Sequence, residues 1–77
     1  MWNRKNSGYD IFCHEPQSGI VNFCKVYEYV EVSEHVFEYQ FVSNAHIWLD
    51  GEPNGPDDWV WSPEGNFWIR FTPDLSY

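Results

Sequence analysis

Acidic residues lie beside tryptophans in one stretch of the chain, DGEPNGPDDWVWSPEGNFW, which covers residues 50–68. This stretch holds five acidic residues and three tryptophans but no lysine or arginine. Carboxylates attract cations, and exposed tryptophans stack on sugars or anchor a protein interface. The stretch therefore predicts a binding surface for a metal ion, a sugar or a basic protein.

The charge of the whole chain indicates which classes of partner are favoured. Twelve acidic residues face four basic ones, for a net charge of −8, and residues 26–69 contain no Lys or Arg. A potential of one sign disfavours nucleic acids and anionic membranes as direct partners, and it favours a cation or a basic protein surface. Solubility alone also explains the charge, because a net charge well away from zero keeps small proteins monomeric.

Residue types that could support nucleophilic catalysis are present, but they are not arranged for it. Cys13 adjoins His14, yet neighbours along a strand point to opposite faces, and no catalytic motif surrounds His35 or His46. A chain of 77 residues also leaves little room for a pocket on the order of a few hundred Å³. We therefore expect that the protein is not an enzyme.

Metal binding is not predicted either. Two cysteines and three histidines could supply zinc ligands, but their spacing fits no compact Cys-x-x-Cys or His-x₃-His pattern. The acidic loop could offer oxygens to calcium, but it does not fit the calcium loop that ends in a glutamate. We predict no metal and no cofactor.

The sequence Trp-Leu-Asp-Gly-Glu-Pro-Asn, followed by Asp-Trp-Val-Trp, resembles the Glu-Pro-Asn loop of C-type lectins. The resemblance implies calcium and sugar binding at Glu52, Pro53 and Asn54. It covers a short part of the chain. The family's later Trp-Asn-Asp is missing, since Trp68 is followed by Ile69, and its disulfide cysteines are missing too. We therefore do not assign the chain to this family.

The composition predicts an all-β fold. Aromatic residues make up 21% of the chain, and such side chains fit a pleated sheet better than a helix. We expect a small antiparallel sheet or partly closed meander of about five or six short strands. A single domain is predicted over residues 9–77, after a flexible arm at 1–8, with one short helix allowed around 43–49. The expected strands are 9–14, 20–32, 35–42, 46–49, 58–62 and 67–72.

Alternation predicts which side chains share a face. An odd-with-odd register between residues 23–31 and 35–42 would gather five aromatic side chains on one face, which we expect to be the core: Tyr27, Tyr29, Phe37, Tyr39 and Phe41. The glutamates of the hairpin would then share the opposite face, in a staggered arrangement, because directly opposed carboxylates repel. These glutamates are Glu28, Glu34 and Glu38.

The N-terminus and the absence of a long apolar run predict the compartment, and the compartment predicts the state of the two cysteines. No apolar run follows the basic N-terminal residues, and no stretch approaches the ~18 apolar residues of a membrane span. A soluble, cytoplasmic protein is expected, in the host cell if the protein is viral. Cys13 and Cys24 are then expected to be free thiols. A disulfide would require their side chains to meet across neighbouring strands.

The functional prediction is a small acidic interaction module, a monomer or homodimer, that binds a basic protein surface. In its most concrete form it is an inhibitor that occupies the basic channel of a nucleic-acid-binding complex. It is similar in size, charge and composition to phage-encoded anti-CRISPR and DNA-mimic inhibitors. The expected anchor is Trp59 or Trp61. The expected acidic contacts are Glu28, Glu31, Glu34, Glu38, Asp50, Glu52, Asp57, Asp58 and Glu64.

Two alternatives stay open. The first is a sugar- or calcium-binding module that uses the tryptophans of the acidic stretch and its flank, namely Trp48, Trp59, Trp61 and Trp68. The second is a structural or assembly subunit of a larger particle.

Overall fold

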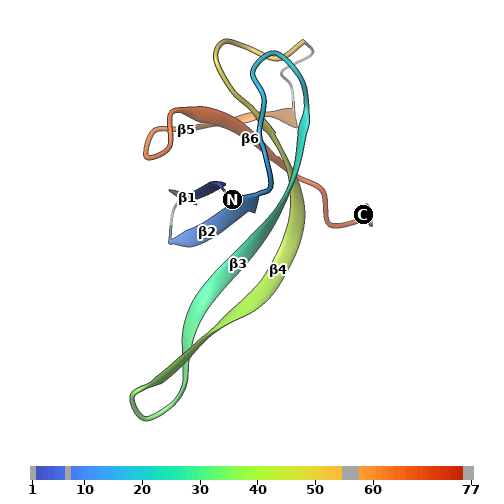
Figure 1. The fold of residues 1–77 in the computed structure, drawn as a ribbon. Helices are drawn as coiled ribbons and strands as arrows, with labels where there is room; N and C mark the ends of the chain where they lie inside the picture. Colours follow the sequence, from blue (N-terminus) through green and yellow to red (C-terminus); the bar gives the residue numbers. More distant parts are fainter. Residues whose placement is uncertain (1, 7, 55–57, 76–77) are drawn as a thin grey trace.

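The computed structural model describes residues 2–6, 8–54 and 58–75, and they form one antiparallel sheet of six strands (Figure 1). The strands are β1 (Trp2–Asn6), β2 (Tyr9–Cys13), β3 (Asn22–Ser33), β4 (Val36–Trp48), β5 (Val60–Ser62) and β6 (Phe67–Phe71). Their order across the sheet is β1-β2-β3-β4-β6-β5. The predicted all-β antiparallel fold is confirmed. Asp57 lies outside the described residues.

The N-terminal segment is part of the sheet over residues 2–6, within the stretch predicted as a flexible arm. β1 pairs antiparallel with β2 over its whole length, from Trp2 opposite Cys13 to Asn6 opposite Tyr9. The Trp2 ring packs edge-to-face on Phe67, with 5.4 Å between the ring centroids. A large, partly buried aromatic side chain at the start of β1 thus packs against the core and holds the segment in place.

β4 is a single long strand, so the predicted break at 43–45 and the short helix around 43–49 are both wrong. A β-bulge shifts the pairing with β3 just before the polar residues Ser43 and Asn44, and the strand continues through them. Val26 pairs with Ser43, but the next residue, Tyr27, pairs with Phe41, so Val42 is the extra residue. Because side chains alternate along a strand, this extra residue changes which positions of β4 face the core.

The core lies on the inner face of the curled sheet. Eight buried side chains form it, two each from β2, β3, β4 and β6: Ile11, Cys13, Cys24, Val26, Ala45, Ile47, Phe67 and Ile69. The curl brings the two edge strands together. Ser62 Oγ on β5 donates a hydrogen bond to Asn6 Oδ1 on β1, at 2.8 Å. The sheet is therefore a half-barrel joined by side chains at its open seam.

The predicted hairpin register is confirmed, but the aromatic face that it creates is not the core. Tyr27 lies opposite Phe41, and Tyr29 lies opposite Tyr39. However, β2 pairs with β3 only at residues 24–27, and β6 pairs with β4 only at 45–48. In the described chain, residues 28–42 therefore project from the sheet as a two-stranded ribbon, which Figure 1 shows in green at the bottom.

Cys13 and Cys24 form a disulfide, which corrects the prediction of free thiols. The two residues are direct partners in the β2–β3 register, with their Cα atoms 4.5 Å apart. They therefore meet the condition for a cross-strand disulfide. Disulfides persist in oxidising compartments, so this disulfide does not support the expected cytoplasmic location.

We expect the double substitution Cys13→Ala and Cys24→Ala to lower the free energy of unfolding by about 2–3 kcal/mol, because the cross-link restricts the unfolded chain. The sequence separation of 11 residues closes a short loop. Urea denaturation of both proteins without reductant, followed by tryptophan fluorescence, measures the difference. Iodoacetamide should leave the mass of the urea-unfolded, non-reduced wild type unchanged. Two alkyl groups per chain would contradict the disulfide.

Candidate functional site

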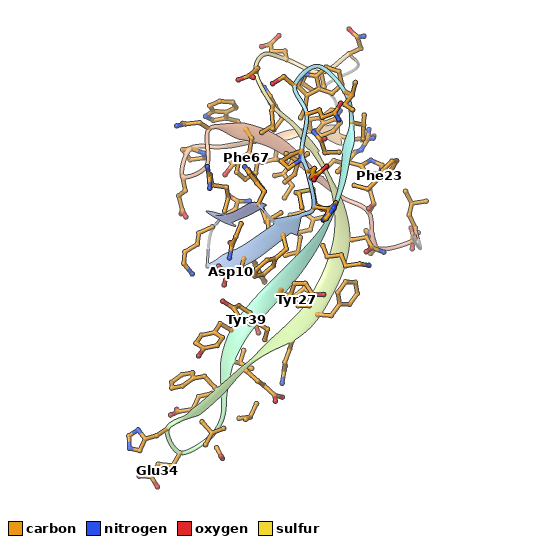
Figure 2. The ribbon with its side chains drawn as sticks, in the orientation of Figure 1. Asp10, Phe23, Tyr27, Glu34, Tyr39 and Phe67 are labelled. Atoms are coloured by element: carbon orange, nitrogen blue, oxygen red, sulfur yellow. A yellow bond between two sulfur atoms is a disulfide. The ribbon has the colours of Figure 1, made fainter. Side chains whose placement is uncertain are left out.

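Six aromatic rings form a continuous ladder on the outer face of β2, β3 and β4, opposite the core. We call this set the aromatic face, and its members are Phe12, Tyr27, Tyr29, Phe37, Tyr39 and Phe41. Each ring contacts the next, in the order Phe41–Tyr27–Phe12–Tyr39–Tyr29–Phe37, with centroid separations of 5.8, 5.4, 5.5, 4.8 and 5.5 Å. Figure 2 shows Tyr27 and Tyr39 where the ribbon leaves the sheet.

Most of the aromatic face is open to solvent. Tyr29, Phe37, Tyr39 and Phe41 have exposed fractions of 54%, 49%, 50% and 54%. Soluble proteins rarely expose a contiguous apolar patch without using it to bind something. The aromatic face is therefore the primary candidate for a functional surface, although the sequence assigned five of its six residues to the core.

The ribbon carries four glutamates beside and behind the aromatic face. Glu28 lies opposite Gln40, and Glu38 lies opposite Val30, so the predicted staggering of these two carboxylates is confirmed. Glu31 lies opposite Phe37, next to the last rings of the ladder. We call Glu28, Glu31, Glu34 and Glu38 the ribbon acids. Glu31 shares the face of the rings, whereas alternation places Glu28 and Glu38 on the other face of the ribbon.

Two of the ribbon acids mark the tip of the hairpin. Glu31 accepts a hydrogen bond from the backbone N–H of His35, at 3.0 Å, and so helps to close the turn. The Glu34 side chain is 90% exposed, and its Oε1 lies 3.7 Å from His35 Nε2. Glu34 is the outermost labelled residue in Figure 2 and is free to meet a partner.

The acidic residues of the loops lie elsewhere. Asp50, Glu52 and Asp58 are exposed in the segment between β4 and β5, and Glu64 is exposed in the β5–β6 turn. The molecule is elongated, at 44 × 25 × 23 Å, and the β4–β5 segment lies at the end opposite the ribbon tip (Figure 1). The predicted acidic residues that the structure describes therefore do not form one surface. Those of the ribbon and those of the β4–β5 segment lie at opposite ends, and Glu64 lies in the β5–β6 turn.

The two tryptophans predicted as anchors have different environments. Trp59 is only 7% exposed, and the Arg70 guanidinium lies over its ring at 4.5 Å, so it contributes to packing. Trp61 is 46% exposed and packs edge-to-face on Trp68. Of the two predicted anchors, only Trp61 is available to a partner. The alternative of a tryptophan-based sugar site stays a prediction, with one of its four rings buried.

An open hollow of about 480 Å³ lies on the outer face beside the disulfide, although the length of the chain predicted little room for one. Its aromatic and basic lining consists of Phe12, His14, Phe23, Lys25, Tyr27 and Tyr39. The hollow is formed by side chains standing on the outer face rather than by a cavity in the thin core. Phe12 and Phe23 were not among the predicted site residues, because the sequence predicted no register between residues 9–14 and 20–32.

The described residues contain no group of three or more His, Cys, Asp or Glu that could hold a metal ion. The two cysteines are also joined in the disulfide and offer no thiolate. Within the same part of the chain, no helix is long and apolar enough to cross a membrane.

Comparison with known proteins gives no assignment. No protein family, curated protein or solved structure matches the chain. Its function must be inferred from its surface.

His46 and Arg70 form a polar contact on the outer face, on paired positions of β4 and β6. Arg70 Nη2 lies 2.8 Å from His46 Nδ1. A guanidinium can only donate, so Nδ1 accepts, and the proton of the neutral imidazole is on Nε2. Burial lowers the pKa of His46, and the charge of Arg70 lowers it further.

Stability is therefore expected to decrease on acidification. In the unfolded chain His46 titrates near 6.5, whereas the folded pKa is lower. Between these two values the unfolded chain binds more protons, so the free energy of unfolding falls as the pH drops through this window. His46→Gln, which keeps an acceptor for Arg70 but cannot titrate, should lose less stability than wild type when the pH falls.

Urea denaturation at roughly pH 7.5 and pH 5.5 measures this difference. His35→Asn is the matched control, because the His35 side chain is 88% exposed and its φ of 63° suits Asn. It should follow wild type. An identical loss of stability in wild type and His46→Gln would contradict the assigned role of His46.

Proposed function

We propose that the protein is an interaction module that binds a basic surface of another protein through the aromatic face and the ribbon acids. The single observation that carries this proposal is the ladder of six rings, which stands outside the core and extends along a ribbon that also carries four glutamates.

The combination of exposed rings and carboxylates suits a basic protein. Aromatic side chains are the commonest anchors of protein interfaces, and burying the exposed half of one ring contributes on the order of 1 kcal/mol. Carboxylates on the ribbon accelerate the encounter with a cationic partner and exclude anionic ones. The net charge of −8 acts in the same direction over a longer range.

The most concrete form of the proposal is an inhibitor of a nucleic-acid-handling complex. Channels for single-stranded nucleic acids combine Arg and Lys, which meet phosphates, with surfaces that meet flat bases. The ribbon offers carboxylates in place of phosphates and tyrosine or phenylalanine rings in place of bases. Because only two strands form the ribbon, it is also narrow enough to enter a groove.

The proposal is tested by capturing proteins from a nuclease-treated lysate with the tagged chain, at low and then high salt. We expect a protein with a basic surface to be captured at low salt and released at high salt. Tyr29→Ser with Tyr39→Ser should weaken this capture at least tenfold, because losing two anchors costs about 1.4 kcal/mol or more. The double substitution Glu34→Lys and Glu38→Lys should abolish the capture.

Asp58→Lys with Glu64→Lys is the matched control, because it makes the same change in net charge outside the ribbon. This variant should still capture the partner, and circular dichroism should show that every variant is folded. Loss of capture in the control variant alone would show that the acidic residues of the loops, rather than those of the ribbon, form the binding surface. Equal capture by wild type and both ribbon variants would contradict the proposed function. Self-association of the isolated chain in size-exclusion chromatography would favour an assembly subunit instead.

A further inference from the structure

We propose that the corner formed by Phe12, Tyr27 and Tyr39 is a binding site for the guanidinium group of an arginine on the partner. This inference rests on the proposed function and deepens it, because it names the side chain that the aromatic face recognises. It is carried by the geometry of three rings, by the contacts of the protein's own cations, and by a buried carboxylate next to the corner.

The three rings are mutually close to perpendicular. The interplanar angles are 81° for Phe12 and Tyr27, 88° for Phe12 and Tyr39, and 78° for Tyr27 and Tyr39. The corresponding centroids are 5.4, 5.5 and 6.4 Å apart. All three rings line the hollow of about 480 Å³. One cation in this hollow can therefore lie within the roughly 6 Å over which an aromatic ring attracts it, for all three rings together.

The protein already binds its own cations in this way. Arg4 lies over the Trp2 ring at 5.1 Å, Lys25 over Phe41 at 5.4 Å, and Arg70 over Trp59 at 4.5 Å. These are three of the four basic residues in the chain. The fourth, Lys5, forms an ion pair with Asp10 at 3.1 Å. In the described part of the chain, no Lys or Arg lies over the rings of the corner, so they are left for a cation from outside.

A buried carboxylate lies next to the corner. Asp10 is the direct cross-strand partner of Tyr27, and its side chain is only 3% exposed (Figure 2). Lys5 binds its Oδ1, whereas its Oδ2 is buried and has no hydrogen-bond partner among the described residues. Asp10 does not line the hollow, so its negative charge attracts a cation there through space rather than through a hydrogen bond.

Lys25 also lines the hollow, but its charge is directed elsewhere. Its Nζ donates to Asn44 Oδ1 at 3.1 Å and lies over Phe41, which is not one of the three corner rings. The stem of Lys25 therefore contributes apolar surface to the hollow, while its ammonium group is held by other partners.

Arginine fits this corner better than lysine. Its guanidinium is planar, stacks on ring faces and loses less hydration than an ammonium group when it is buried. A basic surface that binds nucleic acids is rich in such side chains.

The site is tested by titrating the isotope-labelled wild-type chain with N-acetyl-arginine amide and recording the ring resonances of Phe12, Tyr27 and Tyr39. We expect saturable shifts at millimolar concentrations. N-acetyl-citrulline amide, which has nearly the same shape without the charge, should cause at least tenfold weaker binding. Phe12→Leu and Tyr27→Leu should each weaken arginine binding at least fivefold. Phe71→Leu, which changes an exposed ring on β6 outside the aromatic face, should leave the affinity unchanged.

The outcomes of this experiment distinguish a failure of the arginine site from a failure of the proposed function. Equal binding of arginine and citrulline probes, or tighter binding of N-acetyl-lysine amide, would overturn the arginine site. Capture of a basic partner by Phe12→Leu and Tyr27→Leu as efficiently as by wild type would also overturn it, while the proposed function would stand. Arginine-specific shifts in the corner without capture of any basic partner would support the site and contradict the proposed function.

Discussion

The β-bulge at Val42 is the constraint on which the rest of the structure depends. On the tip side of the bulge, the odd-numbered residues of β4, such as Phe37 and Tyr39, lie on the outer face. Beyond it, the odd-numbered residues Ala45 and Ile47 lie in the core. One extra residue thus lets a single strand supply aromatic side chains to the surface and small or branched ones to the interior. Without the extra residue, the β4 side chains on one side of the bulge would point to the wrong face of the sheet. Either the core or the aromatic face would then lack its residues from β4.

The core is small because the half-barrel is completed without the ribbon. Side chains from β2, β3, β4 and β6 fill its interior, and the disulfide joins β2 to β3 within it. The contact between Ser62 and Asn6 joins the two edges of the sheet. Residues 28–42 contribute no member of this core, so they can vary their surface without opening the fold. This separation places stability at one end of the molecule and the proposed binding surface at the other.

Much of the fold could be predicted from the sequence, because strand composition and turn residues are local properties. The register of the hairpin also followed from alternation, since a slip of one residue would exchange its faces. Burial could not be predicted in the same way. Whether Tyr29 and Tyr39 are covered depends on where β2 and β6 end, and nothing near these tyrosines in the sequence records it. The disulfide needed the same knowledge, because Cys13 and Cys24 are partners only in the observed register.

The central claim is that the ring ladder is exposed and that the core lies elsewhere. Hydroxyl-radical labelling of the native chain, read by mass spectrometry, measures this directly for each aromatic residue. We expect Tyr29, Phe37 and Tyr39 to be oxidised at nearly the rates of the unfolded chain, and Phe67 and Trp59, which are 1% and 7% exposed, to be strongly protected. Protection of the three ribbon rings to the same degree as Phe67 would show that they are packed in an interior, and would contradict this account.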